Sequence, residues 1–157
     1  MDLSPVLHDT FVIERSFPKP PAVVFSALSD PEKMGRWYVP GTEQDVEEFS
    51  VDFRVGGTGL LRYRFKEGSP YPGVAITNEV RYQAIVPDQC IVTTSAMDLG
   101  ATRISASLVT FELFPEDNGT RLILTHKAVF FEGSGGPEMR KQGWVTLLAK
   151  LATEVER

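Results

Sequence analysis

PEMRKQGWVTLLAKLATEV, residues 137–155, is the stretch of the sequence that decides the fold. Its apolar residues recur three and four positions apart at Trp144, Leu148, Leu151 and Val155, which is the spacing of one face of an α-helix. Most other positions are expected on the opposite face, which we assign to Met139, Arg140, Lys141, Gln142, Lys150, Glu154 and Glu156. A long amphipathic helix needs a second layer to cover it, so the rest of the chain is expected to supply a curved sheet.

The chain before this helix consists mainly of predicted strands, in which β-branched and aromatic residues lie between Gly, Pro and Asn breaks. One strand is expected at residues 8–17 and a continuous β region from Glu43 onward, with strands at 46–55, 61–65, 74–86, 90–97, 104–114 and 120–131. Two short helices, 22–29 and 31–38, are expected after the first strand because prolines stand where each begins. The turn at Asn118-Gly119 predicts a hairpin, and hairpins between successive strands make the sheet antiparallel. The predicted class is therefore α+β.

The composition indicates one globular domain over residues 1–157, with 42% hydrophobic and 24% charged residues. A net charge of −5 argues against nucleic-acid binding, which normally uses a basic surface. No apolar run is long enough to span a membrane and the N-terminus lacks the pattern of a signal peptide, so we expect a cytoplasmic protein. The single cysteine, Cys90, excludes an internal disulfide and is expected to be a buried, inert thiol.

Four short motifs, in this order, resemble one known family. They are FVIERSFPKPPAVVFSALSDPEKMGRWYVP at residues 11–40, the D-x-R-x-G-G pattern at 52–57, GT followed by LILTH at 119–126, and Gly143-Trp144 with the leucines that follow. Together they are similar to the family of activators of heat-shock protein 90 ATPase, over about residues 11–155. The loop at residues 68–73 departs from the family pattern.

The resemblance implies the helix-grip fold of the START-like (SRPBCC) superfamily, with a hydrophobic cavity between the sheet and the long helix. It implies less about activity, because single-domain members of the family share no common function. The activator that names the family has a second, N-terminal domain that contributes to chaperone binding. We expect no room for that domain in this chain, so a chaperone partner ranks last among the hypotheses.

Several inward-facing polar and aromatic residues are candidates for a ligand site in that cavity. His126 shares the parity of Leu122, Leu124 and Phe130 and should point inward, and Tyr63, Asn78 and Tyr82 are expected to do the same. A few polar groups in an apolar cavity are typical of a small-molecule site, although a lone inward histidine is more often a satisfied core residue. Trp37 would line the mouth of the cavity or pack in the core.

The long helix is expected to divide its apolar face between the cavity and the sheet. Trp144 and Leu148 are expected to face the cavity, while Leu151 and Val155 anchor the helix. Gly143 would cost about 1 kcal/mol inside a helix, which a close approach to the sheet would explain.

The inventory for catalysis is thin, so no catalytic residue, metal site or cofactor is predicted. The only other histidine is His8, and no H-x-H or HExxH spacing is present. The glycines at 56–57 precede a strand rather than a helix, which favours a tight turn beside an Asp52–Arg54 ion pair over a phosphate-binding loop.

The leading hypothesis is a binder of a small hydrophobic molecule in the cavity. The alternatives are a cyclase- or dehydratase-like enzyme, which requires a hydrogen bond between His126 and Tyr63 or Tyr82, and a regulator of a chaperone ATPase. A homodimer formed through a strand edge or the short helices is compatible with each of them.

Overall fold

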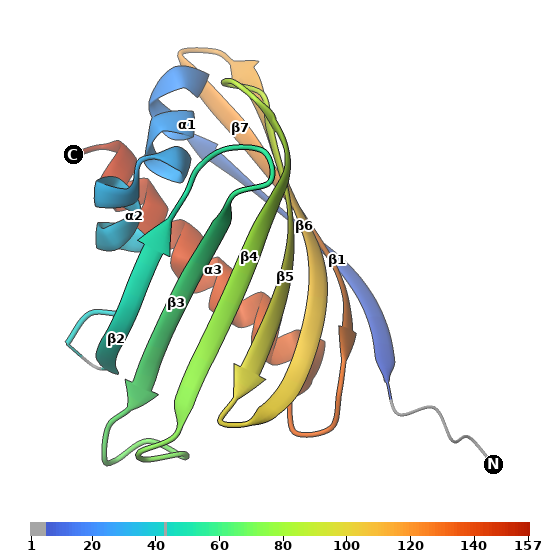
Figure 1. Cartoon of the computed structure of the whole chain (residues 1–157). Helices are drawn as coiled ribbons and strands as arrows, with labels where there is room; N and C mark the ends of the chain where they lie inside the picture. Colours follow the sequence, from blue (N-terminus) through green and yellow to red (C-terminus); the bar gives the residue numbers. More distant parts are fainter. Residues whose placement is uncertain (1–5, 43) are drawn as a thin grey trace.

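In the part of the chain that the structure describes, seven strands and three helices follow one another in the order β, α, α, six strands, α (Figure 1). The computed structural model describes residues 6–42 and 44–157, so the predicted start of the β region at Glu43 lies outside the described residues. The elements are β1 (Leu7–Phe17), α1 (Pro21–Ser29), α2 (Pro31–Trp37), β2 (Gln44–Val51), β3 (Thr58–Phe65), β4 (Ala75–Val86), β5 (Cys90–Leu99), β6 (Thr102–Glu116), β7 (Gly119–Phe130) and α3 (Gly136–Val155).

All the strands belong to one antiparallel sheet with the order β1-β7-β6-β5-β4-β3-β2. β1 and β2 are consecutive in sequence but form opposite edges, so α1 and α2 carry the chain from one edge to the other. From β2 the chain returns strand by strand until β7 pairs with β1. The sheet twists and curves around α3 (Figure 1), which confirms the predicted helix-grip architecture.

Two tight turns between strands depend on their glycines. Asn118 takes a φ of 57°, and a Cβ on Gly119 would lie 2.2 Å from the Phe17 carbonyl oxygen, so the predicted hairpin is confirmed. The predicted strand 46–55 ends instead at Val51, because residues 52–57 fold into a turn with Gly56 at a φ of 84°. In this turn Arg54 and Asp52 form the expected ion pair at 2.8 Å.

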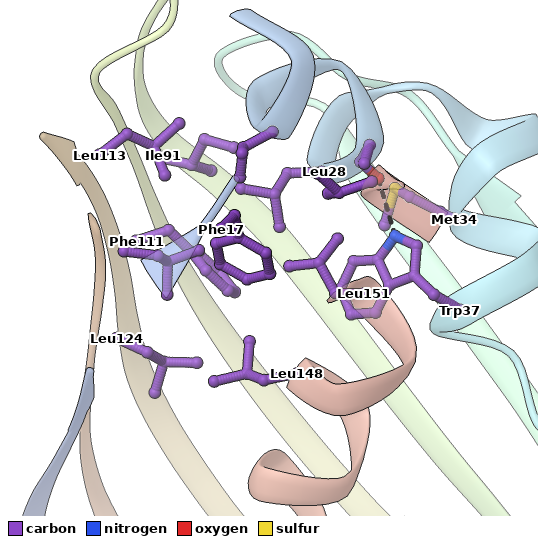
Figure 2. Packing of buried hydrophobic residues seen from close by; sticks show 14 of the residues in the cluster. Phe17, Leu28, Met34, Trp37, Ile91, Phe111, Leu113, Leu124, Leu148 and Leu151 are labelled. Atoms are coloured by element: carbon purple, nitrogen blue, oxygen red, sulfur yellow. Dashed lines mark hydrogen bonds between the residues drawn. The ribbon is translucent and has the colours of Figure 1, made fainter. Parts of the chain in front are cut away.

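The core lies where α3 crosses the concave face of the sheet. On β7, Leu122 and Leu124 alternate with more exposed residues and are fully buried. Leu148 and Leu151 extend from α3 into this core, and Figure 2 shows Leu148 facing Leu124 and Leu151 near Trp37. α3 packs mainly against β1 and the two short helices, so its opposite side faces the remaining strands across a wider gap.

Glu154 corrects the expected polar face of α3, because it is buried rather than solvent-facing. Both of its carboxylate oxygens accept hydrogen bonds from Arg36 of α2, at 2.8 and 2.9 Å. This pairing lowers the pKa of Glu154 and keeps the carboxylate charged. The pair ties α2 to the C-terminal end of α3, which a helical periodicity alone does not reveal.

Candidate functional site

A cavity of about 470 Å³, here called the large cavity, lies between α3 and the concave face of the sheet. Strands β2 to β7, the segment after α2 and the residues of α3 from Met139 to Lys150 contribute to its lining. Most of this lining is apolar or aromatic. Ligand pockets in proteins typically measure about 300–1,000 Å³, so the large cavity has the size of a small-molecule site.

A second space of about 70 Å³, the small cavity, lies toward α1 and α2 and is lined mainly by apolar side chains. Several residues line both spaces: Tyr38, Leu61, Asn78, Ser95, Val109 and Trp144. The two cavities are therefore neighbours, separated by shared side chains rather than by a layer of core.

The predicted site residues divide into three groups. Tyr63, Asn78, His126 and Trp144 all line the large cavity, so the structure brings these four together. Tyr82, whose pKa burial raises to about 12, lines the small cavity and not the large one. The remaining two, Trp37 and Leu148, belong mainly to the core.

Trp37 packs among the short helices and does not line the large cavity. Its side chain is 2% exposed, and its Nε1–H donates a hydrogen bond of 2.7 Å to the Ala27 carbonyl (Figure 2). Trp37 also contributes to the lining of the small cavity. Of the two roles considered from the sequence, the packing role is the one that these contacts support.

Leu148 does not face the large cavity, and its neighbour Leu147 lines the cavity instead. The expected close approach of Gly143 to the sheet is also wrong, because a Cβ there would meet no atom within 4 Å. Gly143 lies on the cavity lining, so its missing side chain leaves space at the cavity. Both corrections concern the side of α3 that faces the large cavity. This side includes Gly143 and Leu147, whereas the expected side included Leu148.

His126 lies on β7, is 1% exposed and stacks on Phe11 with the ring centroids 4.5 Å apart. Burial, assisted by the positive charge of Arg140, lowers its pKa to about 4, so the imidazole is neutral at pH 7. Its Nδ1 has no hydrogen-bond partner among the described residues. The imidazole is thus a polar group of the cavity lining, and its Nδ1 bonds to no residue that the structure describes.

The hydrogen bond that the enzyme hypothesis required between His126 and a tyrosine is not present in the described part of the chain. The cavity tyrosine that does form a hydrogen bond is Tyr38, which accepts one from Asn78 Nδ2. Burial raises the pKa of Tyr38 to about 12, so its hydroxyl stays protonated and remains a donor.

The polar lining residues that the sequence did not predict include Gln44, Arg140 and Lys150. Gln44 Oε1 is buried without a hydrogen-bond partner among the described residues, like His126 Nδ1. Arg140 was expected on the solvent face but extends across the cavity to Ser105 on β6. A signal for Arg140 was present in the sequence, because it lies four residues before Trp144 and so shares its side of α3.

Outside the large cavity, the described residues show neither a metal-binding cluster nor a reactive thiol. No group of three His, Cys, Asp or Glu side chains that could hold a metal occurs within residues 6–42 and 44–157. Cys90 is half-buried, and burial raises the pKa of its thiol, which makes it a weak nucleophile. No helix in the described part of the chain is long and apolar enough to cross a membrane.

Comparison with known proteins places the chain in a family. Residues 18–156 match the family described as activator of Hsp90 ATPase homolog 1-like protein. No curated protein matches the sequence significantly.

Solved structures with the same fold include several bacterial proteins. A Rhizobium leguminosarum protein shares 35% identity at a TM-score of 0.89, with 97% of each chain covered. The Mll3558 protein of Rhizobium loti shares 42% identity at a TM-score of 0.84, covering 95% of this chain and 98% of that one. An AHSA1-like protein of Aeromonas hydrophila, 22% identical with a TM-score of 0.69 over 94% and 92% of the chains, shows the same fold. The family match and these relatives show that the chain belongs to the activator of Hsp90 ATPase homolog 1-like family.

Proposed function

We propose that the chain binds a small hydrophobic molecule in the large cavity between the sheet and α3. The observation that carries this proposal is the lining: apolar walls around about 470 Å³, with a few polar groups from separate strands. Both described side-chain atoms that are buried without a hydrogen-bond partner, Gln44 Oε1 and His126 Nδ1, belong to this lining. Buried polar atoms normally find a partner, so these two mark the lining as a place where the described protein leaves polar groups unsatisfied.

The side of α3 that faces the cavity suits the passage of an apolar molecule. Met139 lies on the lining and is 67% exposed, which places a flexible apolar side chain at the mouth. One turn along α3, Gly143 adds no side chain to the same lining. Trp144 then supplies a broad aromatic surface, packed edge-on against Phe111 at 5.7 Å.

The described contacts support binding more than catalysis. His126 is neutral at pH 7 and has Phe11 and Phe130 as its ring neighbours. A general base should hydrogen-bond the group that it deprotonates or a residue that orients it, and no such protein partner is present among the described residues. We therefore assign His126 to orientation of the bound molecule.

Binding can be tested with N-phenyl-1-naphthylamine, a neutral aromatic dye whose fluorescence rises in apolar surroundings. We expect saturable binding to the purified protein, and native mass spectrometry of the same sample would detect any co-purified small molecule. The variant Gly143→Phe places a ring on the cavity lining and should weaken dye binding by more than tenfold. Gly35→Phe is the matched control, because Gly35 also has open space around its Cβ but lies on α2 away from both cavities.

Loss of dye binding in Gly143→Phe alone supports the large cavity as the site. Equal binding by both variants would show that the dye binds elsewhere. If the dye does not bind and native mass spectrometry detects no co-purified molecule, the proposal fails. A role of the protein surface, such as regulation of a chaperone ATPase, then becomes the better hypothesis.

A further inference from the structure

Arg140 is the most unusual charged residue of the large cavity. Its guanidinium lies over the ring of Phe130 at 5.3 Å, and its Nη2 donates a hydrogen bond of 2.8 Å to Ser105 Oγ. The same nitrogen lies 3.3 Å from Met97 Sδ. Ser105 is fully buried, so the arginine side chain extends from α3 into the protein rather than toward solvent.

No carboxylate balances this charge in residues 6–42 and 44–157. Other arginines of the chain, such as Arg36 and Arg103, form ion pairs at 2.8 and 2.5 Å, whereas Arg140 forms none with a described residue. Burial consequently lowers the pKa of Arg140, although an arginine remains charged. Placing a guanidinium in an apolar cavity without a counter-ion is costly, unless an anion joins it there.

The charge of the lining is one-sided. The described lining residues with a full positive charge are Arg140 and Lys150, and none is an Asp or Glu. This contrasts with the whole chain, in which 21 acidic residues outnumber 16 basic ones. A cavity with only positive charges attracts anions, even in a protein whose net charge is −5.

The guanidinium also keeps unused donors. Its hydrogen bonds to described residues involve only Nη2, so Nε and Nη1 have no protein partner there. Nε and Nη1 point to different sides of the guanidinium, so each can donate a single charge-assisted N–H···O bond to a carboxylate, and such bonds are stronger than those between neutral groups. Next to it, Trp144 and Val109 provide apolar walls for the body of a bound molecule.

We propose that the large cavity selects hydrophobic molecules that carry one carboxylate, which pairs with Arg140 while the apolar body lies along Trp144. This inference rests on the proposed function and names the chemical class of its ligand. A neutral analogue of the same length leaves the buried charge of Arg140 unpaired. The difference in affinity between two ligands should therefore depend more on whether they carry a carboxylate than on the shape of their apolar part.

The test compares decanoate with decan-1-ol as competitors that displace N-phenyl-1-naphthylamine. In the wild-type protein we expect decanoate to compete at least tenfold better than the alcohol. In Arg140→Met the order should reverse, because an apolar cavity disfavours a carboxylate that has no partner. Arg62→Met is the control for net charge, since Arg62 is exposed on β3, outside both cavities, and this variant should keep the preference for decanoate.

The outcomes separate this inference from the proposed function. If the dye binds but decanol competes as well as decanoate in the wild type, the carboxylate preference is wrong and hydrophobic binding stands. If dye, acid and alcohol all fail to bind, the proposed function itself is wrong. Should Arg140→Met not fold, Arg140→Gln removes the charge but keeps a polar side chain, and it should also abolish the preference for decanoate; an unchanged preference would overturn the pairing with Arg140.

Discussion

His126 shows how burial and a neighbouring cation act on the same side chain. The imidazole is buried beside the rings of Phe11 and Phe130 and is affected by the charge of Arg140, and both burial and this charge oppose its protonation. The folded protein therefore holds a neutral histidine over a pH range in which an exposed histidine takes up a proton. This difference makes the stability of the fold depend on pH.

We predict that the free energy of unfolding falls as the pH drops from about 6.5 to about 4. In this range His126 is protonated in the unfolded chain but stays neutral in the folded protein, where its pKa is about 4. The His126 contribution should reach roughly 2–3 kcal/mol at the acid end. Urea unfolding at pH values from 7.5 to 4.5 measures it, with His126→Leu as the comparison, since leucine does not titrate. Parallel pH profiles for both proteins would contradict the prediction.

Substitutions of the two tryptophans are expected to have different effects, one mainly on the stability of the fold and the other mainly on dye binding. Trp37→Phe removes the donor to the Ala27 carbonyl in a buried place, which should cost about 1–3 kcal/mol and leave dye affinity nearly unchanged. Trp144 lines both cavities, is half-buried and has no side-chain hydrogen bond to a described residue, so Trp144→Phe should weaken dye binding at a smaller cost in stability. Urea unfolding and dye titration of both variants check this. A larger loss of dye affinity in Trp37→Phe would assign Trp37 to the site instead.

At the scale of the element, α3 carries two stripes with different partners. Leu148, Leu151 and Val155 pack into the core, whereas Met139, Gly143 and Leu147 line the large cavity. The periodicity of the sequence predicted the helix and its apolar stripe, but it assigned Leu148 to the cavity, whereas Leu148 belongs to the core. It could not predict the second stripe, because its members include a glycine and side chains of mixed polarity.

Arg140 and Glu154 were placed on the wrong face for a related reason. A charged side chain is normally exposed unless it finds a hydrogen-bond partner inside the protein. Here Glu154 accepts a hydrogen bond from Arg36, and Arg140 donates one to Ser105. Both partners come from elements far away in sequence. Their positions depend on how α2 and β6 pack against α3, which spacing along one helix does not contain.

Gly143 and Gly35 form a natural pair for testing α3. Both are helical glycines whose Cβ would meet no atom within 4 Å, so an alanine at either position should stabilise the protein by about 1 kcal/mol. Thermal and urea unfolding measure the gain. If Gly143→Ala destabilises the protein while Gly35→Ala does not, then α3 approaches the sheet closely at that position after all.

At the scale of the whole molecule, the topology creates the cavity. β1 pairs with β7 at one edge, and the connection through α1 and α2 puts β2 at the other. Because α3 packs toward β1 and the short helices, the concave face of the later strands is left for the cavity. The succession of strands along the chain, hairpins such as Asn118-Gly119 and the long helix could all be predicted from local sequence patterns, whereas the pairing of β1 with β7 could not. The cavity wall could be predicted only in part, since sheet curvature and helix rotation decide which inward residues, Leu147 or Leu148, meet a ligand.

Because the lining comes from six strands and α3, a bound molecule should stabilise the whole fold rather than one segment. A ligand that binds only the folded state, at a free concentration of 100 times its Kd, adds about 2.7 kcal/mol to the free energy of unfolding. For a chain of 157 residues this corresponds to a rise in Tm of roughly 5–10 °C. Thermal unfolding followed by circular dichroism, with N-phenyl-1-naphthylamine at saturation, measures the rise, and Gly143→Phe should show little of it at the same dye concentration. A saturating dye that leaves the Tm of the wild-type protein unchanged would mean that it binds folded and unfolded chains alike, which a cavity formed by sheet and helix together does not allow.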